Sequence, residues 1–142
     1  MSTSTAINDV EEGLTFKPKF DASGLVTCVA TDAGTGEVLM VAHMNDEALR
    51  KTIASGEAWY FSRSRQSLWR KGESSGHVQR VVEMRIDCDQ DAVCIRVEQT
   101  GAACHTGRRS CFYRAVTAGE GGAQLSFVDA ERLFDPQDVY RK

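Results

Sequence analysis

The stretch from Asp87 to Cys111 constrains this chain most, because it combines strand-forming segments with more ligand chemistry than a small core requires. It reads D-C-D-Q-D, then the apolar-rich V-C-I-R-V-E, and then C-H-T-G-R-R-S-C. Carboxylates hold hard cations in proteins, and thiolates hold softer ones. We therefore expect this stretch to build metal-binding chemistry and the rest of the chain to present a substrate to it.

Alternation of apolar and polar residues predicts a β-hairpin in this region. Val78–Cys88 alternates, and Val93–Gln99 alternates again after the turn D-Q-D-A. Side chains of successive strand residues point to opposite faces, so Asp87 and Asp89 should point one way and Cys88 the other. On this argument the carboxylates and Cys88 do not serve one metal within the same chain.

The two faces predict two sites of different chemistry. The oxygen set consists of Asp87, Asp89 and Asp91, which suit Mg²⁺ or a similar cation. Cys104 and Cys111 lie in a glycine-containing loop that can bring both thiolates together. With Cys88 they form a three-thiolate set for Zn²⁺ that leaves a fourth position for water, which is typical of a catalytic zinc site.

Other interpretations of these ligands remain open from the residues alone. The spacing C-x15-C-x6-C is not a zinc-finger signature, and the chain contains no C-x-x-C pair. The thiols could hold a structural zinc completed by His105, or they could simply be buried. An acid-rich turn without metal is the alternative for the aspartates. Because three thiolates weaken zinc as a Lewis acid, a base beside it would help, and His105 follows Cys104 directly.

A basic segment precedes the hairpin. Within residues 59–80, the basic side chains Arg63, Arg65, Arg70, Lys71 and Arg80 stand against Glu73 alone. In an extended chain Arg63 and Arg65 would project from one side, and guanidinium groups match phosphate oxygens. Hydroxyls and glycine-exposed amides would complete an anion pocket. The alternative is a solvated basic loop; the interleaved Trp69, Gly72 and Gly76 favour a nucleotide or phosphate site.

The remaining segments predict an α+β, β-rich fold. A hairpin is expected from Leu25–Thr31 and residues 37–43, and a helix of about ten residues between Asn45 and Gly56. Further strands are expected at Trp59–Phe61, after Cys111 and at Gln124–Val128, with a loop over 117–122. Val128–Phe134 is expected as a short helix that ends before Pro136. His43, Cys28 and Cys94 are interpreted as structural.

Length and composition limit the possible roles of the chain. Its 142 residues predict one domain: a loose lead over about 1–15, a catalytic core over 20–116 and an extension over 117–142. A net charge of −3 argues against nucleic-acid binding. No apolar run is long enough for a membrane span, and the N-terminus has no export-signal pattern. Five cysteines without such a signal favour reduced thiols, and the chain is expected in the cytoplasm.

Two long motifs identify a family. The run W-Y-F-S-R-S-R-Q-S-L-W-R-K-G-E-S-S-G, followed by D-C-D-Q-D and C-H-T-G-R-R-S-C, closely resembles phosphoribosyl-AMP cyclohydrolases. The opening F-D-A-S-G-L-V and the M-N-D-E-A-L of the predicted helix are similar too. The resemblance covers residues 20–116. It implies hydrolytic opening of the adenine ring of 1-(5-phosphoribosyl)-AMP between N1 and C6, a step of histidine biosynthesis.

The resemblance also implies cofactors and site residues. Zinc would be held by the cysteines matching Cys88, Cys104 and Cys111, with Cys88 supplied across the interface of an intertwined homodimer. Magnesium would be held by Asp87, Asp89 and Asp91. His105 would manage the protons. The candidates for the two substrate phosphates are Arg63, Arg65, Lys71 and Ser75. Together with this resemblance, the segments predict a mixed or antiparallel sheet that is folded on itself, barrel-like, with one or two short helices.

Two rival functions can be compared with this one. A zinc nucleotide deaminase would show H-x-E followed by P-C-x-x-C, and this chain has neither. A non-catalytic, zinc-stabilised nucleotide-binding module would show a closed four-ligand site with His105 on the metal. The partners expected are therefore a small nucleotide substrate and a second copy of the chain, with no nucleic acid and no membrane.

Overall fold

A computed structural model describes residues 10–137, so residues 1–9 of the expected lead and 138–142 of the expected extension lie outside it. The strands are β1 Val26–Asp32, β2 Val38–Met44, β3 Trp59–Ser62, β4 Ser67–Arg70, β5 Gln79–Ile86, β6 Ala92–Gln99, β7 Arg114–Gly119 and β8 Gly122–Phe127. The helix α2 spans Asp46–Ser55, and residues 10–12 form one helical turn. No described helix is long and apolar enough to span a membrane.

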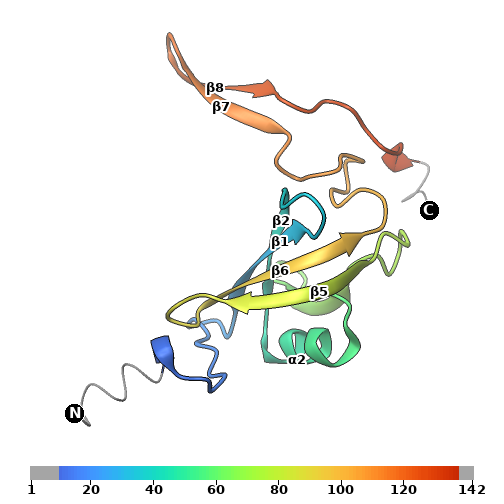
Figure 1. Ribbon diagram of the computed structural model, residues 1–142. Coiled ribbons are helices and arrows are strands. Elements are labelled where there is room, and N and C mark those ends of the chain that lie inside the picture. The colour runs from blue at the N-terminus through green and yellow to red at the C-terminus, as the bar shows by residue number, and fades with distance from the viewer. Residues whose placement is uncertain (1–9, 138–142) are drawn as a thin grey trace.

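A four-stranded sheet in the order β2-β1-β6-β5 forms the centre of the molecule (Figure 1). β1 pairs antiparallel with β2 and parallel with β6, and β6 pairs antiparallel with β5. Val93, Ile95 and Val97 alternate along β6 and are almost fully buried, as their period of two predicts. Both predicted hairpins are therefore confirmed, and the central pair β1–β6 carries much of the core.

The helix α2 has the ends that the sequence predicts. The Asn45 side chain accepts a hydrogen bond of 2.8 Å from the Ala48 amide, and Gly56 ends the helix with a φ of 77°. Ala48, Leu49 and Thr52 form its buried face. The Thr52 hydroxyl accepts a 2.9 Å hydrogen bond from the Trp59 amide, which fixes the start of β3 against the helix.

β3 and β4 form a separate hairpin whose tip contradicts one prediction. Residues 63–66 are a turn, and Gln66 has a φ of 51°. The expectation that Ser62–Arg65 is extended is therefore wrong, and the same-side placement of Arg63 and Arg65 loses its basis. Buried side chains connect this hairpin to the sheet, since the Tyr60 hydroxyl donates a 2.6 Å hydrogen bond to the Gln79 side chain of β5.

The sheet does not close into a barrel, which corrects the expected fold. In the described chain, the edge strands β2 and β5 are not paired with each other, and β3–β4 and β7–β8 are independent two-stranded units. A closed barrel requires every strand edge to be paired, and the outer edges of β2 and β5 are not paired with each other in the described chain. The fold is β-rich and mixed, with short helical segments, as predicted.

The segment after Cys111 also differs from its prediction. β7 and β8 extend through most of residues 117–122, leaving a tight turn at Glu120 and Gly121 instead of a loop. Residues 128–134 are not helical; a helical turn begins only at Pro136, where the Gln137 amide bonds the Asp135 side chain at 2.9 Å. Figure 1 shows this hairpin projecting from the sheet and the chain returning from it towards the loop after β6.

Candidate metal and substrate site

The loop after β6, residues 101–111, is called the ligand loop because it carries Cys104, His105 and Cys111. Its backbone closes on itself: the Cys104 amide bonds the Arg108 carbonyl at 3.1 Å, and the Gly107 amide bonds the Cys104 carbonyl at 3.0 Å. The far end is fixed to β2 by a 2.7 Å bond from the Cys111 amide to the Leu39 carbonyl. This folding places the Cys104 thiol beside the Cys111 thiol, close enough to affect the pKa of Cys111.

The Cys111 thiol stands in surroundings that favour its protonated form. Burial raises the pKa of Cys111 to about 12, and the neighbouring Cys104 thiol adds to the effect. The Cys104 sulfur also lies 3.0 Å from the Thr106 hydroxyl oxygen. Metal binding requires thiol ligands in their deprotonated form, so a cation bound between two neighbouring thiols releases their protons.

Lys71 reaches the same loop from the segment after β4. Its ammonium donates a hydrogen bond of 2.5 Å to the carbonyl of Ala103, the residue before Cys104. Burial lowers the pKa of Lys71, while Cys111 and Cys104 raise it. The structure therefore places this predicted phosphate contact beside the thiol pair and in contact with the ligand loop.

A pocket of about 380 Å³ lies between the loop after β4 and the ligand loop. Of the residues predicted for the site, Arg65, Lys71, Ser75, His105 and Cys111 line it. The fold thus brings together the basic segment and the thiol loop, which the sequence separates by about thirty residues.

Arg63 is the predicted substrate residue that does not line this pocket. It lies near His43, whose pKa is lowered first by burial and then by the Arg63 charge. Arg63 is exposed at the tip of the β3–β4 hairpin. The structure consequently separates the two arginines that the sequence pattern groups together.

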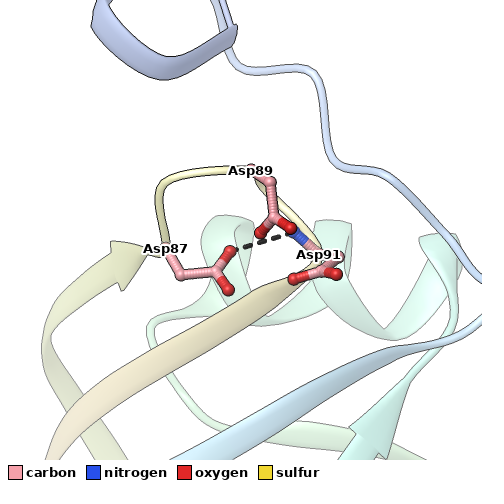
Figure 2. A group of neighbouring side chains, drawn as sticks. All are labelled: Asp87, Asp89 and Asp91. Carbon is pink, nitrogen blue, oxygen red and sulfur yellow. Dashed lines mark hydrogen bonds between the residues drawn. The ribbon is translucent and has the colours of Figure 1, made fainter.

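The three aspartates form a second cluster in the β5–β6 turn, as Figure 2 shows. One carboxylate oxygen from each of Asp87, Asp89 and Asp91 lies within 4.8 Å of the others. Burial raises the pKa of Asp87, but hydrogen bonds from the Ala92 and Asp91 amides outweigh it and hold that pKa low. Hydrogen bonding with Asp89 and then Asp87 raises the pKa of Asp91 to about 6.

Cys88 lies in the same turn and is exposed. The strand β5 ends at Ile86, so the strand-parity argument for Asp87, Cys88 and Asp89 is wrong in its premise. Its conclusion about the aspartates and Cys88 agrees with a different fact: the group formed by Asp87, Asp89 and Asp91 does not include Cys88 among the described residues. The eight residues of β6, at about 3.3 Å each, separate this turn from the ligand loop by about 25 Å. Within residues 10–137, Cys88 joins no three-ligand group with the other thiols.

Several residues that contribute to the site carry no clear sequence signal. Trp69, Arg70 and Ser74 line the pocket; the basic segment and its interleaved aromatic residue indicate the first two, whereas Ser74 has no separate sequence signal. Thr106 contacts a thiol, and its signal is its place two residues after Cys104. Arg108 is buried, and its Nε atom has no hydrogen-bond partner among the described residues.

Comparisons with known proteins agree on one family. The model of the family described as phosphoribosyl-AMP cyclohydrolase matches residues 40–113. A protein of that name from Nitrobacter hamburgensis is 77% identical over 141 residues, which cover 99% of this chain and 96% of that protein. A Bradyrhizobium diazoefficiens protein of the same name is 79% identical over 95% of this chain and 96% of its own length. A Rhodopseudomonas palustris protein of the same name is 68% identical over 99% of this chain and 97% of its own length.

Proposed function

The chain belongs to the phosphoribosyl-AMP cyclohydrolase family, and we propose that the pocket between the loop after β4 and the ligand loop is where it acts. The reaction is hydrolysis of the N1–C6 bond in the adenine ring of 1-(5-phosphoribosyl)-AMP, in histidine biosynthesis, and its proposed compartment is the cytoplasm. One observation supports this location of the active site: Arg65, His105 and Cys111 line one pocket although they come from separate segments.

A zinc ion fits the donor set at the ligand loop. Cys104 and Cys111 are neighbours in the folded loop, Cys104 is buried, and its sulfur lies 3.0 Å from the Thr106 hydroxyl oxygen. This arrangement suits a cation that takes thiolate ligands. Zinc bound there would supply Lewis-acid activation of water. The third thiolate is proposed to be Cys88 from a second copy of the chain, because β6 keeps a chain's own Cys88 about 25 Å away.

The residues of the chain then have separate tasks. His105 is exposed at the pocket and follows a proposed ligand, so it can accept a proton from water and return one to the leaving ring nitrogen. The positive charge that N1 substitution places on the purine makes C6 electrophilic. Arg65 and Ser75 offer a guanidinium and a hydroxyl to substrate phosphates. Lys71 holds the loop and adds positive charge.

Magnesium is proposed at the aspartate cluster. Three carboxylate oxygens within 4.8 Å form the hard, partly hydrated site that this cation prefers. Asp87 also accepts hydrogen bonds from the Asp91 and Ala92 amides, which gives the turn its shape with or without a cation. The cluster lies about 25 Å along β6 from the ligand loop of the same chain. A dimer in which the β5–β6 turn of one copy meets the ligand loop of the other would therefore bring the two metals together.

The proposal is tested by metal analysis followed by a ring-opening assay with 1-(5-phosphoribosyl)-AMP. We expect one zinc per chain, loss of turnover on zinc removal and its return on zinc addition. A metal-free protein with full turnover would overturn the zinc assignment. Release of ammonia in place of ring opening would favour a deaminase.

His105→Ala tests the proton-transfer role. The variant should keep its zinc and bind substrate, while kcat falls by about 10²–10⁴-fold, the usual contribution of a general acid or base. His43→Ala is the matched control, because His43 does not line the pocket. Unchanged kcat in His105→Ala would remove this residue from the mechanism, and loss of zinc would make it a ligand.

A further inference from the structure

We propose that residues 132–134, here called the strap, position the ligand loop and thereby hold Cys104 and Cys111 together. The importance of that loop for catalysis rests on the proposed function; the mechanical claim does not. The strap belongs to the expected C-terminal extension and lies beyond residues 40–113, which the family model matches.

The first contact is at Gly107, in the middle of the ligand loop. The Leu133 amide donates a 2.6 Å hydrogen bond to the Gly107 carbonyl. The backbone of Phe134 lies so close above Gly107 that a Cβ added there would stand 2.2 Å from the Phe134 carbonyl oxygen. Gly107 also has a φ of 94°, a conformation that favours glycine. The strap leaves no space for a side chain at position 107, and the backbone conformation there disfavours one.

Gly107 is well placed to control the distance between the thiols. Its amide closes the turn onto the Cys104 carbonyl at 3.0 Å, and it lies between Cys104 and Cys111 in the loop. The strap covers the carbonyl side of this turn. Opening the turn would move Cys104 away from Cys111, because the Cys111 end is fixed separately to β2 by its bond to Leu39.

The second contact joins the strap to the other wall of the pocket. The Phe134 ring packs on His77 with centroids 4.8 Å apart. His77 directly follows the 71–76 loop that lines the pocket, and its Nδ1 atom is buried without a hydrogen-bond partner among the described residues. His77 in turn packs against Gly101 at the start of the ligand loop. The strap therefore touches both segments that form the pocket.

The chain that leads to the strap is attached to the same loop. The guanidinium of Arg108, the residue after Gly107, stacks on the Tyr113 ring at 4.2 Å and on the Phe127 ring at 5.3 Å. Tyr113 and Phe127 lie at the base of the β7–β8 hairpin, where the Val128 amide bonds the Tyr113 carbonyl at 3.0 Å. A two-stranded hairpin is marginal alone, so these contacts direct the returning chain onto the loop.

Alkylation of cysteines in the metal-free protein tests the strap without relying on catalysis. Peptide mass spectrometry after iodoacetamide treatment gives the rate for each thiol, and the fully buried Cys28 reports global unfolding. In Phe134→Ala and Gly107→Ala, Cys104 should react about tenfold or more faster than in the parent, as expected for local opening, while Cys28 does not change. Phe134→Leu should restore most of the protection.

Gly121→Ala is the matched control for Gly107→Ala. Gly121 has a φ of 84°, and a Cβ there would meet nothing within 4 Å, so the substitution adds backbone strain without touching the loop. Its Cys104 rate should equal that of the parent. In a chain ending at Glu131 the strap is absent, so the added Cβ has no Phe134 carbonyl to clash with. Gly107→Ala should then not raise the alkylation rate of Cys104 through that clash.

Zinc competition supplies the second readout. Strap variants should lose at least about tenfold in zinc affinity against a chromophoric chelator, with Gly121→Ala unchanged. The strap is refuted if Cys104 protection and zinc affinity stay at parent values in both Phe134→Ala and Gly107→Ala, or if Cys104 accelerates only in parallel with Cys28. A parent protein that fails to open the adenine ring would refute the proposed function and leave the alkylation result intact.

Discussion

At the scale of single residues, Lys71 shows how strongly burial changes the meaning of a charge. A lysine in a loop rich in serine and glycine indicates an exposed phosphate ligand. In the structure it is 9% exposed and bonded to the Ala103 carbonyl. A buried ammonium is costly unless polar or negative groups face it, and deprotonated thiols beside it would supply that charge. Lys71 and the thiol pair would therefore stabilise one another once the thiols are deprotonated.

Cys104→Ser should abolish zinc binding and turnover, because a serine hydroxyl does not replace a thiolate on zinc. Cys94→Ser is the control: Cys94 is a half-buried residue of β6 outside the ligand loop. Zinc content by mass spectrometry and turnover should be lost only in the first variant. A Cys104→Ser protein with one zinc per chain and normal turnover would take Cys104 off the ligand set.

Asp91 should titrate near pH 6 in the metal-free protein, since its pKa is raised to about 6 by hydrogen bonding with Asp89 and Asp87. Neighbouring carboxylates favour its protonated form, whereas a cation favours the charged form. Carbon-13 NMR of the aspartate carboxyls should thus show the midpoint move to lower pH when Mg²⁺ is added. Asp89→Asn should also move the Asp91 midpoint to lower pH, because it removes the neighbouring carboxylate that raises the pKa of Asp91 most. A midpoint insensitive to millimolar Mg²⁺ would count against the cation site.

At the scale of elements, local chemistry predicts α2 well and the tail poorly. Asn45 and Gly56 determine where the helix begins and ends through contacts with their own neighbours. The expected alternation in β5 breaks at a bulge between Val81 and Glu83, which leaves Val82 half exposed. Residues 128–134 are expected to be helical, but they are not, and the Leu133 amide donates a hydrogen bond to the Gly107 carbonyl of the ligand loop.

Asn45→Ala should destabilise the protein by about 1 kcal/mol, the usual cost of losing a helix N-cap. The lost contact is the 2.8 Å bond from the Ala48 amide. Arg50→Ala is the matched control on the same helix, because its pair with Asp46 is exposed and contributes only a few tenths of a kcal/mol. Urea unfolding of both variants measures the difference. Equal midpoints would show that the cap does not stabilise the helix.

At the scale of the whole molecule, the length of β6 decides how the ligands can meet. Cys88 precedes this strand, and Cys104 follows it. A continuous strand of eight residues cannot bend its two ends together, so the three cysteines do not converge within one chain. Exposure of Cys88 at the β5–β6 turn leaves it accessible to a second copy.

Mixing Cys88→Ser with Cys104→Ser protein tests a shared site. Each variant alone should lack turnover, whereas mixed dimers regain one complete zinc site that combines the intact Cys88 of one chain with the intact Cys104 of the other. Turnover should rise to about a quarter of the parent's per chain if the copies mix statistically and each dimer holds two sites. Mixing Cys104→Ser with Cys111→Ser is the control and should give no rescue. Absence of rescue in the first mixture would place the site within one chain.

The sequence by itself determined the elements that depend on neighbours in the chain: both sheet hairpins and α2 with its caps. It also indicated which carboxylates and thiols are candidate ligands. Only the tertiary structure decided how these parts meet. It placed the basic loop against the ligand loop, buried Lys71, separated Arg63 from Arg65 and kept the sheet open. These outcomes depend on contacts between residues far apart in sequence, such as Lys71 with Ala103 and Leu133 with Gly107. Periodicity and spacing carry no information about such contacts, because they describe only how each segment folds on itself.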